Sequence, residues 1–192
     1  MSLLEAMIEI ATFLEERQVP YAVIGGVALQ HWGEPRLTRD VDVTVMVSQQ
    51  DLDGFLAAAL RRFSARIPAA LAFAKRNRVL LLSSTDGTPI DLTLGIPGYE
   101  EEVMRRAVLV AFPGLSPVRL ISAEDLIIHK CVAGRPRDLE DVERILVHQR
   151  LELNLRYIRG WLRAFAPVVE QHDVTGVFER ALRRARAALR RS

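Results

Sequence analysis

The stretch YAVIGGVALQHWGEPRLTRDVDVTVMV, residues 21–47, decides the fold of this 192-residue chain. It begins with a short apolar run, Tyr21–Ile24, continues through two glycines and a helical segment, and ends in an alternating run, Val41–Val47. Valine occupies every second position of that last run, which is typical of a half-buried strand. The stretch therefore predicts two strands connected by a glycine turn and a helix.

Two acids lie on the polar face of the second predicted strand. Asp40 and Asp42 are two positions apart, so their side chains leave the same face about 6.5–7 Å apart along the chain. Like charges at this spacing repel unless a cation lies between them. Because Mg²⁺ prefers oxygen ligands and suits one or two carboxylates completed by substrate phosphates, the pair predicts a site for metal and phosphate.

A third acid follows on a predicted β-hairpin. Val79–Ser83 and Pro89–Leu94 flank an Asp-Gly turn signal, and the alternation of the second strand places Asp91 on the face away from the core. Carboxylates on adjacent strands can hold two metal ions about 3.5–4 Å apart, as in phosphoryl or nucleotidyl transfer.

The glycine pair adds a phosphate-binding element. Gly25 and Gly26 let the backbone approach a phosphate without a Cβ in the way, and a helix that begins near Val27 points its free N–H groups at the same place. Each feature alone has an ordinary explanation: a glycine pair is often just a turn, and Asp-x-Asp is often solvated. Their order and phase together favour a functional site.

The remaining pattern predicts an α+β fold with an all-helical C-terminal tail. Residues 64–77 are ambiguous, because Ile67-Pro68 interrupts any long helix there. We expect a core over residues 1–121 and a C-terminal helical region, residues 122–192, packed on it. The other expected helices are 2–17, 51–63, 100–106, 123–133, 138–149, 153–166 and 174–190, and the other expected strands are 108–112 and 118–121.

The composition limits the class of protein and the cellular compartment to be expected. Hydrophobic residues make up 49% and charged residues 26%, as in soluble globular proteins. Cys131 is the only cysteine, which excludes an internal disulfide and fits a reducing cytosol. With neither an export signal nor an apolar run of membrane-spanning length, we expect a cytoplasmic protein with no membrane partner.

Basic charge is concentrated at the end of the chain. Residues 1–149 hold 16 Lys+Arg against 20 Asp+Glu, whereas residues 150–192 hold 10 Arg against 4 acids. The last predicted helix carries a face suited to an RNA backbone, although a solvated helix face explains the same pattern. Its arginines are Arg180, Arg183, Arg184, Arg186, Arg190 and Arg191.

The combination of Gly25-Gly26, Asp40-Val41-Asp42 and Asp91 resembles the DNA polymerase β-like nucleotidyltransferase superfamily. The wording IGGVALQHWG followed by TRDVDVTV is most similar to the AbiEii-type abortive-infection toxin nucleotidyltransferases and their uncharacterised relatives. The resemblance covers about residues 20–147. It implies a small mixed β-sheet core flanked by helices, and Mg²⁺-dependent transfer of an NMP from an NTP to an acceptor hydroxyl.

The resemblance also implies roles. Asp40 and Asp42 would ligate both of two Mg²⁺ ions, and Asp91 would ligate the catalytic one and help deprotonate the acceptor. The segment LIIHKCVAGRPRDLEDV supplies Lys130, to neutralise charge on the leaving pyrophosphate, and Asp138, to orient Lys130 or the nucleotide. Lys130 as a surface lysine and Asp138 as a helix N-cap are the ordinary alternatives.

Two further candidates for nucleotide binding, Thr38 and Arg39, lie just before the acid pair. They either touch phosphate or only shape the loop. One departure concerns Val27, where many active relatives have Ser or Thr. An alternative is therefore a catalytically inactive member that binds nucleotide or a partner. A glycosyltransferase using Asp-x-Asp is disfavoured, because repeated βαβ units are not evident.

The acceptor is open at this point: tRNA or another RNA held by the basic C-terminal helices, a protein, or a small molecule. The resemblance also implies a toxin–antitoxin component, with an antitoxin or another protein as partner.

Overall fold

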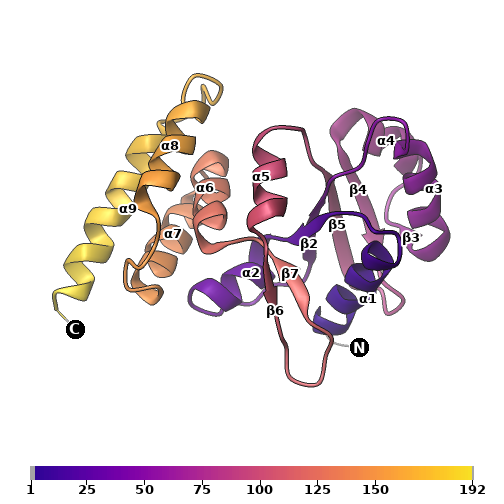
Figure 1. The fold of residues 1–192 in the computed structure, drawn as a ribbon, viewed down its shortest axis with the longest axis horizontal. Coiled ribbons are helices and arrows are strands. Elements are labelled where there is room, and N and C mark those ends of the chain that lie inside the picture. Colours follow the sequence, from indigo (N-terminus) through magenta and orange to yellow (C-terminus); the bar gives the residue numbers. More distant parts are fainter. Residues whose placement is uncertain (1–2, 192) are drawn as a thin grey trace. The chain divides into compact units, whose positions relative to one another are not determined.

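A computed structural model describes residues 3–191, which divide into two compact units (Figure 1). The sheet unit takes the chain up to Val27 and again Leu37–Ile121, and the helical unit takes Ala28–Arg36 and the chain from Ser122 onward. Helix α2 (Gly25–Trp32) begins in the first and ends in the second.

The sheet unit is built on a mixed sheet, with seven strands within residues 3–191 in the order β3-β4-β5-β2-β1-β7-β6. Neighbours β2 and β5 are parallel, as are β1 and β7, and the other pairs are antiparallel. The mixed sheet expected from the sequence is therefore confirmed. The strands are β1 (Tyr21–Val23), β2 (Val41–Val45), β3 (Ser64–Ala65), β4 (Val79–Ser83), β5 (Pro89–Leu94), β6 (Val108–Val110) and β7 (Val118–Leu120).

Alternation gives the sheet a buried face and a polar face. In β5 the odd-numbered Asp91 and Thr93 are half-buried, while the residues between and beside them are fully buried. In β2 the valines are buried and Asp42 is half-buried. The phase predicted for both acids is therefore confirmed.

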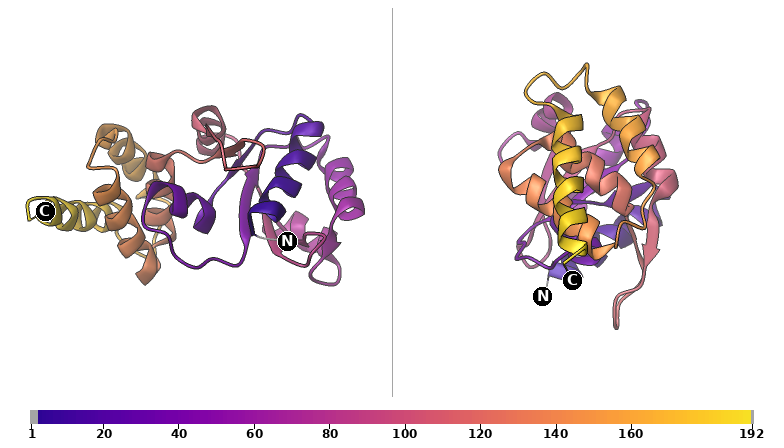
Figure 2. Two further views of the ribbon diagram at one scale, coloured as in Figure 1. Left: turned by 90° about the horizontal axis from the view of Figure 1, so that it is seen from below. Right: turned by 90° about the vertical axis from the view of Figure 1, so that its left-hand side faces the viewer.

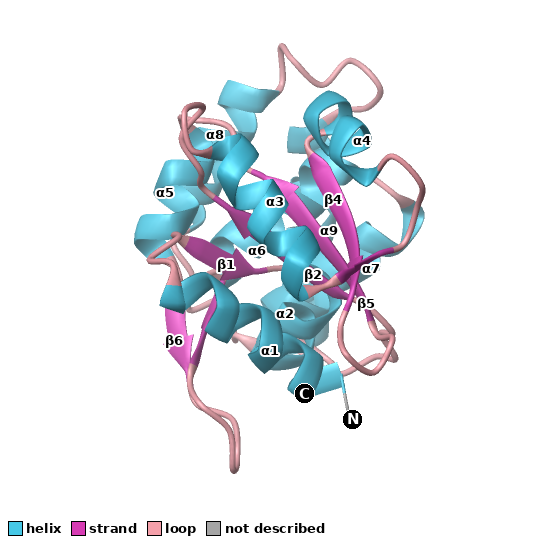
Figure 3. Ribbon diagram, turned by 90° about the vertical axis from the view of Figure 1, so that its right-hand side faces the viewer, coloured by secondary structure: helices cyan, strands magenta, loops and turns pink. Residues whose placement is uncertain are grey.

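Helices α1 (Leu3–Glu16) and α3 (Leu52–Arg62) lie together over the strands, as Figure 3 shows. Phe13 of α1 contacts two aromatic rings. Its ring centroid lies 6.1 Å from that of Phe55 in α3 and 5.3 Å from that of Phe63, the residue directly after α3. These aromatic contacts join the two helices into one apolar layer.

The ambiguous segment, residues 64–77, forms the edge strand β3 and helix α4 (Ala70–Asn77), which packs against β4. Both residues of β3 are exposed, so no alternation marks the strand in the sequence. Helix α5 (Tyr99–Arg106) packs against β1. No helix within residues 3–191 combines the length and apolar character needed to cross a bilayer.

The helical unit is formed by the end of α2 and four later helices, in which α9 packs against both α7 and α8 (Figure 2). The Ser122 hydroxyl caps α6 by accepting the Asp125 N–H at 3.1 Å, and Gly134, with φ +62°, ends that helix. The four helices are α6 (Ala123–Ala133), α7 (Pro136–His148), α8 (Leu155–Phe165) and α9 (Val174–Leu189).

Candidate functional site

The parallel pair β2 and β5 brings two of the predicted acids together. Asp42 and Asp91 are direct partners in the strand register, so their side chains leave the same face of neighbouring strands. Adjacent strands lie about 4.8 Å apart, which is a short separation for two carboxylates of like charge. The sheet therefore places them where a shared cation would be most stabilising.

Asp40 lies one residue before β2, two positions from Asp42. Its Oδ1 accepts a hydrogen bond from the Thr38 hydroxyl at 2.8 Å, and both residues are half-buried. Thr38 therefore orients the carboxylate of Asp40 in this conformation. Arg39, between them, is exposed.

The two glycines leave room for the side chains of Asp42 and Thr38. Gly25 has φ +63°, and a Cβ there would overlap the carboxylate of Asp42. A Cβ on Gly26 would lie 2.6 Å from the Cβ of Thr38. The backbone at the start of α2 therefore packs directly against the acid-bearing strand and the loop that precedes it.

The start of α2 differs from the expectation. The helix was predicted to begin near Val27 but begins at Gly25, because Gly25 can adopt the positive φ that lets the turn close immediately after β1. Val27 is only 2% exposed, so its side chain belongs to the core. Any phosphate contact at this position would therefore come from backbone N–H groups.

Arg66 is a site residue that the sequence reasoning missed. Its guanidinium forms an ion pair with Asp91, and its backbone N–H donates to the Leu81 carbonyl at 3.0 Å. Leu81 is in turn the register partner of Asp91 on β5. The only signal was a basic residue next to Ile67-Pro68, in a segment with no readable periodicity.

Within residues 3–191, no group of three or more His, Cys, Asp or Glu side chains is arranged to hold a metal ion. Asp40 is bonded to Thr38 and Asp91 to Arg66, so the predicted three-acid site is not converged in this conformation. The donors are all carboxylate oxygens on one sheet face, next to a backbone that a phosphate can approach. This set fits Mg²⁺ completed by phosphate oxygens.

Lys130 and Asp138, the other predicted pair, meet inside the helical unit. The Lys130 ammonium donates to Asp138 Oδ1 at 3.1 Å and to Asp141 Oδ2 at 2.7 Å. The three side chains are 8%, 3% and 2% exposed. Lys130 is therefore not a surface lysine but the centre of a buried ion cluster.

Asp138 does not cap α7 as the N-cap. Arg135 is the N-cap residue, and Asp138, inside the first turn, accepts its backbone N–H at 3.0 Å. A second cation, Arg36, lies 3.4 Å from Asp141. Asp141 and Arg36 are 105 residues apart, so the pairing has no local sequence signal.

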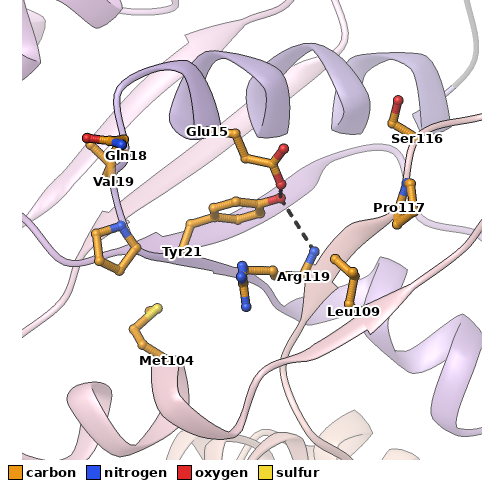
Figure 4. Close-up of a pocket in the computed structure, with 10 residues that line it drawn as sticks. Glu15, Gln18, Val19, Tyr21, Met104, Leu109, Ser116, Pro117 and Arg119 are labelled. Atoms are coloured by element: carbon orange, nitrogen blue, oxygen red, sulfur yellow. Dashed lines mark hydrogen bonds between the residues drawn. The ribbon is translucent and has the colours of Figure 1, made fainter.

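A separate hollow of about 600 Å³ lies at the other end of β1 from Gly25 (Figure 4). The Tyr21 hydroxyl donates to Glu15 Oε1 at 2.8 Å and accepts the Arg119 backbone N–H at 3.4 Å. Burial and the bond to Glu15 raise the pKa of Tyr21 above its usual range. The hollow contains none of the predicted acids or glycines, so it is not the candidate site.

Comparisons with known proteins identify a family and a fold. The family described as "Nucleotidyl transferase AbiEii toxin, Type IV TA system" matches residues 14–191. No curated protein sequence matches the chain significantly.

Among solved structures, an antigenic nucleotidyltransferase-like protein from Paracoccidioides brasiliensis is 16% identical, with a TM-score of 0.54 and 92% of each chain covered. The antibiotic-resistance factor ANT(2'')-Ia is 17% identical, with a TM-score of 0.45, over 100% of this chain and 97% of that one. JHP933 from Helicobacter pylori is 15% identical, with a TM-score of 0.46, over 96% and 89%. The first of these likenesses supports a shared fold.

Proposed function

The chain belongs to the nucleotidyl transferase AbiEii toxin family, and from this premise we propose that it transfers an NMP from an NTP to an acceptor hydroxyl. The observation that carries the proposal is the register of Asp42 opposite Asp91, with the start of α2 in contact with Asp42. Acids beside the N-terminus of a helix suit a metal-bound triphosphate.

In this proposal the acids and the glycines divide the work. Asp40, Asp42 and Asp91 would hold two Mg²⁺ ions, which supply the positive charge that a transferring phosphoryl group requires. The N–H groups that follow Gly25 and Gly26 would bind triphosphate oxygens. Asp91 would accept the proton of the acceptor hydroxyl, so this carboxylate must first leave Arg66.

The proposal includes the predicted roles of two further residues. Lys130 would neutralise charge on the leaving pyrophosphate, and Asp138 would orient Lys130 or the nucleotide. The ammonium of Lys130 donates to two carboxylates, and it would have to exchange one of them for a phosphate oxygen. Thr38 and Arg39 complete the proposed nucleotide contacts. Thr38 would act through Asp40, whose carboxylate it already orients.

We further propose RNA, with tRNA included, as the acceptor, and an antitoxin as the protein partner. The family name supports a toxin–antitoxin setting. The six arginines at the end of the chain, carried by α9 and the two residues after it, are exposed, and phosphate contacts of this kind give salt-dependent binding. Acceptor and partner both rest on these two observations.

Each labelled NTP should be incubated with the protein, Mg²⁺ and either total RNA or lysate protein. We expect label in RNA, and we expect Asp42→Asn to reduce it about 10²–10³-fold, since the lost charge stabilisation is worth several kcal/mol. Asp53→Asn is the matched control, because Asp53 is an exposed acid paired with Lys75 on the helices of the sheet unit. Equal transfer by wild type and Asp42→Asn would refute the proposal.

A second function rests on Val27. Its side chain is buried where many active relatives have a hydroxyl, which is compatible with a member that binds nucleotide or a partner without catalysis. Metal-dependent NTP binding with no transfer to RNA, protein or small hydroxyl compounds would favour this alternative.

A further inference from the structure

We propose that Arg66 is a built-in competitor for the metal site: its guanidinium neutralises Asp91 until a divalent cation replaces it. Arg66 thereby sets the metal affinity of the acid-bearing face. The inference rests on the proposed function in taking Asp91 to be a metal ligand. It goes beyond that function by assigning a role to a residue outside the acids and glycines.

The first support is the position of Arg66 in the sheet. Its backbone N–H donates to Leu81, Leu81 pairs with Asp91, and Asp91 pairs with Asp42. Arg66, Leu81, Asp91 and Asp42 therefore form one row across four neighbouring segments. The side chain of Arg66 therefore crosses β4 to contact Asp91, and its positive charge comes from the edge of the sheet.

The second support is the use of the same carboxylate. The ion pair involves Asp91 Oδ1, one of the two oxygens through which this carboxylate could bind a metal ion. An ion at the same lone pair would have to displace the guanidinium. An ion at the other oxygen would lie close to the guanidinium, whose positive charge repels it, so Arg66 opposes metal binding in either case.

The third support is exposure. The side chains of Arg66 and Asp91 are 28% and 33% exposed, so water screens their pair and its rupture costs little. Arg78 provides a contrast, because its guanidinium binds the backbone: it donates to the carbonyls of Leu94 at 3.0 Å and Gly95 at 2.6 Å. Arg66 has the weaker, exchangeable kind of contact.

The test measures Mn²⁺ binding to the full chain without nucleotide, by the loss of the free-ion electron paramagnetic resonance signal. We expect Arg66→Gln to bind Mn²⁺ about 2- to 5-fold more tightly than wild type, the range of an exposed ion pair. Arg66→Lys keeps the charge and should stay near wild type, while Asp91→Asn should bind more weakly.

Arg62→Gln is the matched control, since Arg62 also pairs with a carboxylate of the sheet unit, Glu9 at 2.7 Å, away from the acid-bearing face. Its Mn²⁺ affinity should equal that of wild type. Unchanged or weaker binding by a folded Arg66→Gln protein would overturn the inference, as would the absence of Mn²⁺ binding to every variant.

A second measurement needs no change at Arg66. The ¹⁵Nε–H resonance of Arg66 in the wild-type chain should shift on addition of Mg²⁺, and Asp91→Asn should abolish the shift. A resonance insensitive to Mg²⁺ would count against the competition. Neither measurement depends on transfer, so inactivity with every acceptor would reject the proposed function and leave the role of Arg66 standing.

Discussion

The two units hold carboxylates in opposite ways. On the sheet, Asp91 is one-third exposed and shares an ion pair with a partly exposed arginine. In the helical unit, Asp138 and Asp141 are 3% and 2% exposed and enclose the ammonium of Lys130. The same residue types therefore form a partly exposed pair in one unit and a buried cluster in the other.

Solvent accounts for the difference. A charge transferred from water into the interior loses its hydration, and only well-placed partners compensate for that loss. Lys130 and its two acids satisfy one another within hydrogen-bonding distance, so removal of any member leaves the remaining buried charges with fewer partners. The half-exposed acids of the sheet can exchange partners because water is available to replace each one.

The largest expected effect breaks the buried cluster. Lys130→Met should lower the free energy of unfolding by about 3 kcal/mol, because it removes the buried cation that Asp138 and Asp141 share and leaves them only the more exposed Arg135 and Arg36. Urea unfolding followed by circular dichroism measures this. Lys75→Met, which removes an exposed pair with Asp53, should cost less than about 1 kcal/mol.

Equal losses from the two lysine variants would contradict the comparison, because burial would then have no bearing on the strength of the pair. Asp138→Asn sharpens the result: it removes one of two acids and keeps a partner for Lys130, so its loss should fall between those of the lysine variants.

A smaller effect concerns the contact between Gly25 and the sheet acids. Gly25→Ala should cost about 1–3 kcal/mol through the positive φ alone. The added Cβ also overlaps the Asp42 carboxylate, so transfer and Mn²⁺ binding should fall as well. Transfer and Mn²⁺ binding are both measured on the folded variant, at saturating and at limiting metal concentrations.

Gly87→Ala is the control, because Gly87 has φ +88° in the hairpin turn and a Cβ there meets nothing within 4 Å. It should lose stability and keep its affinity for Mn²⁺. A Gly25→Ala protein with unchanged metal affinity would show that the contact with Asp42 is not part of the site.

The last expected effect is a pH dependence of the helical unit, which is spread over more than two pH units. Burial lowers the pKa of His129, next to Lys130 on α6, from 6.5 to about 4, although Asp125 opposes the shift. The unfolded chain therefore takes up this proton first as pH falls. Stability present above pH 6.5 should be lost towards pH 4, by about 1 kcal/mol per pH unit.

Urea unfolding between pH 7 and pH 4 measures the loss attributable to His129. His129→Gln should flatten that part of the profile, because glutamine does not titrate. If the variant keeps the slope of the wild type, the dependence arises elsewhere.

Local patterns predicted the parts of the fold in which neighbours in sequence determine the outcome. The hairpin at residues 79–94 and the phase of Asp91 follow from a turn signal and alternation, and both are confirmed. Arg66 escaped prediction because β3 is a two-residue exposed edge without periodicity. The partnership of Arg36 with Asp141 depends on tertiary packing between distant segments, which a linear pattern does not contain.

The division of α2 between the units has a consequence for synthesis. Its second half belongs to the helical unit, where Gln149 Nε2 donates to the Trp32 carbonyl at 2.9 Å across 117 residues of sequence. At translation rates of about 5–20 residues per second, that partner emerges roughly 6 to 25 seconds after Trp32. A nascent chain that has completed its sheet therefore still holds Ala28–Arg36 without the contacts that this segment makes in the helical unit, so α2 matures only when most of the protein has left the ribosome.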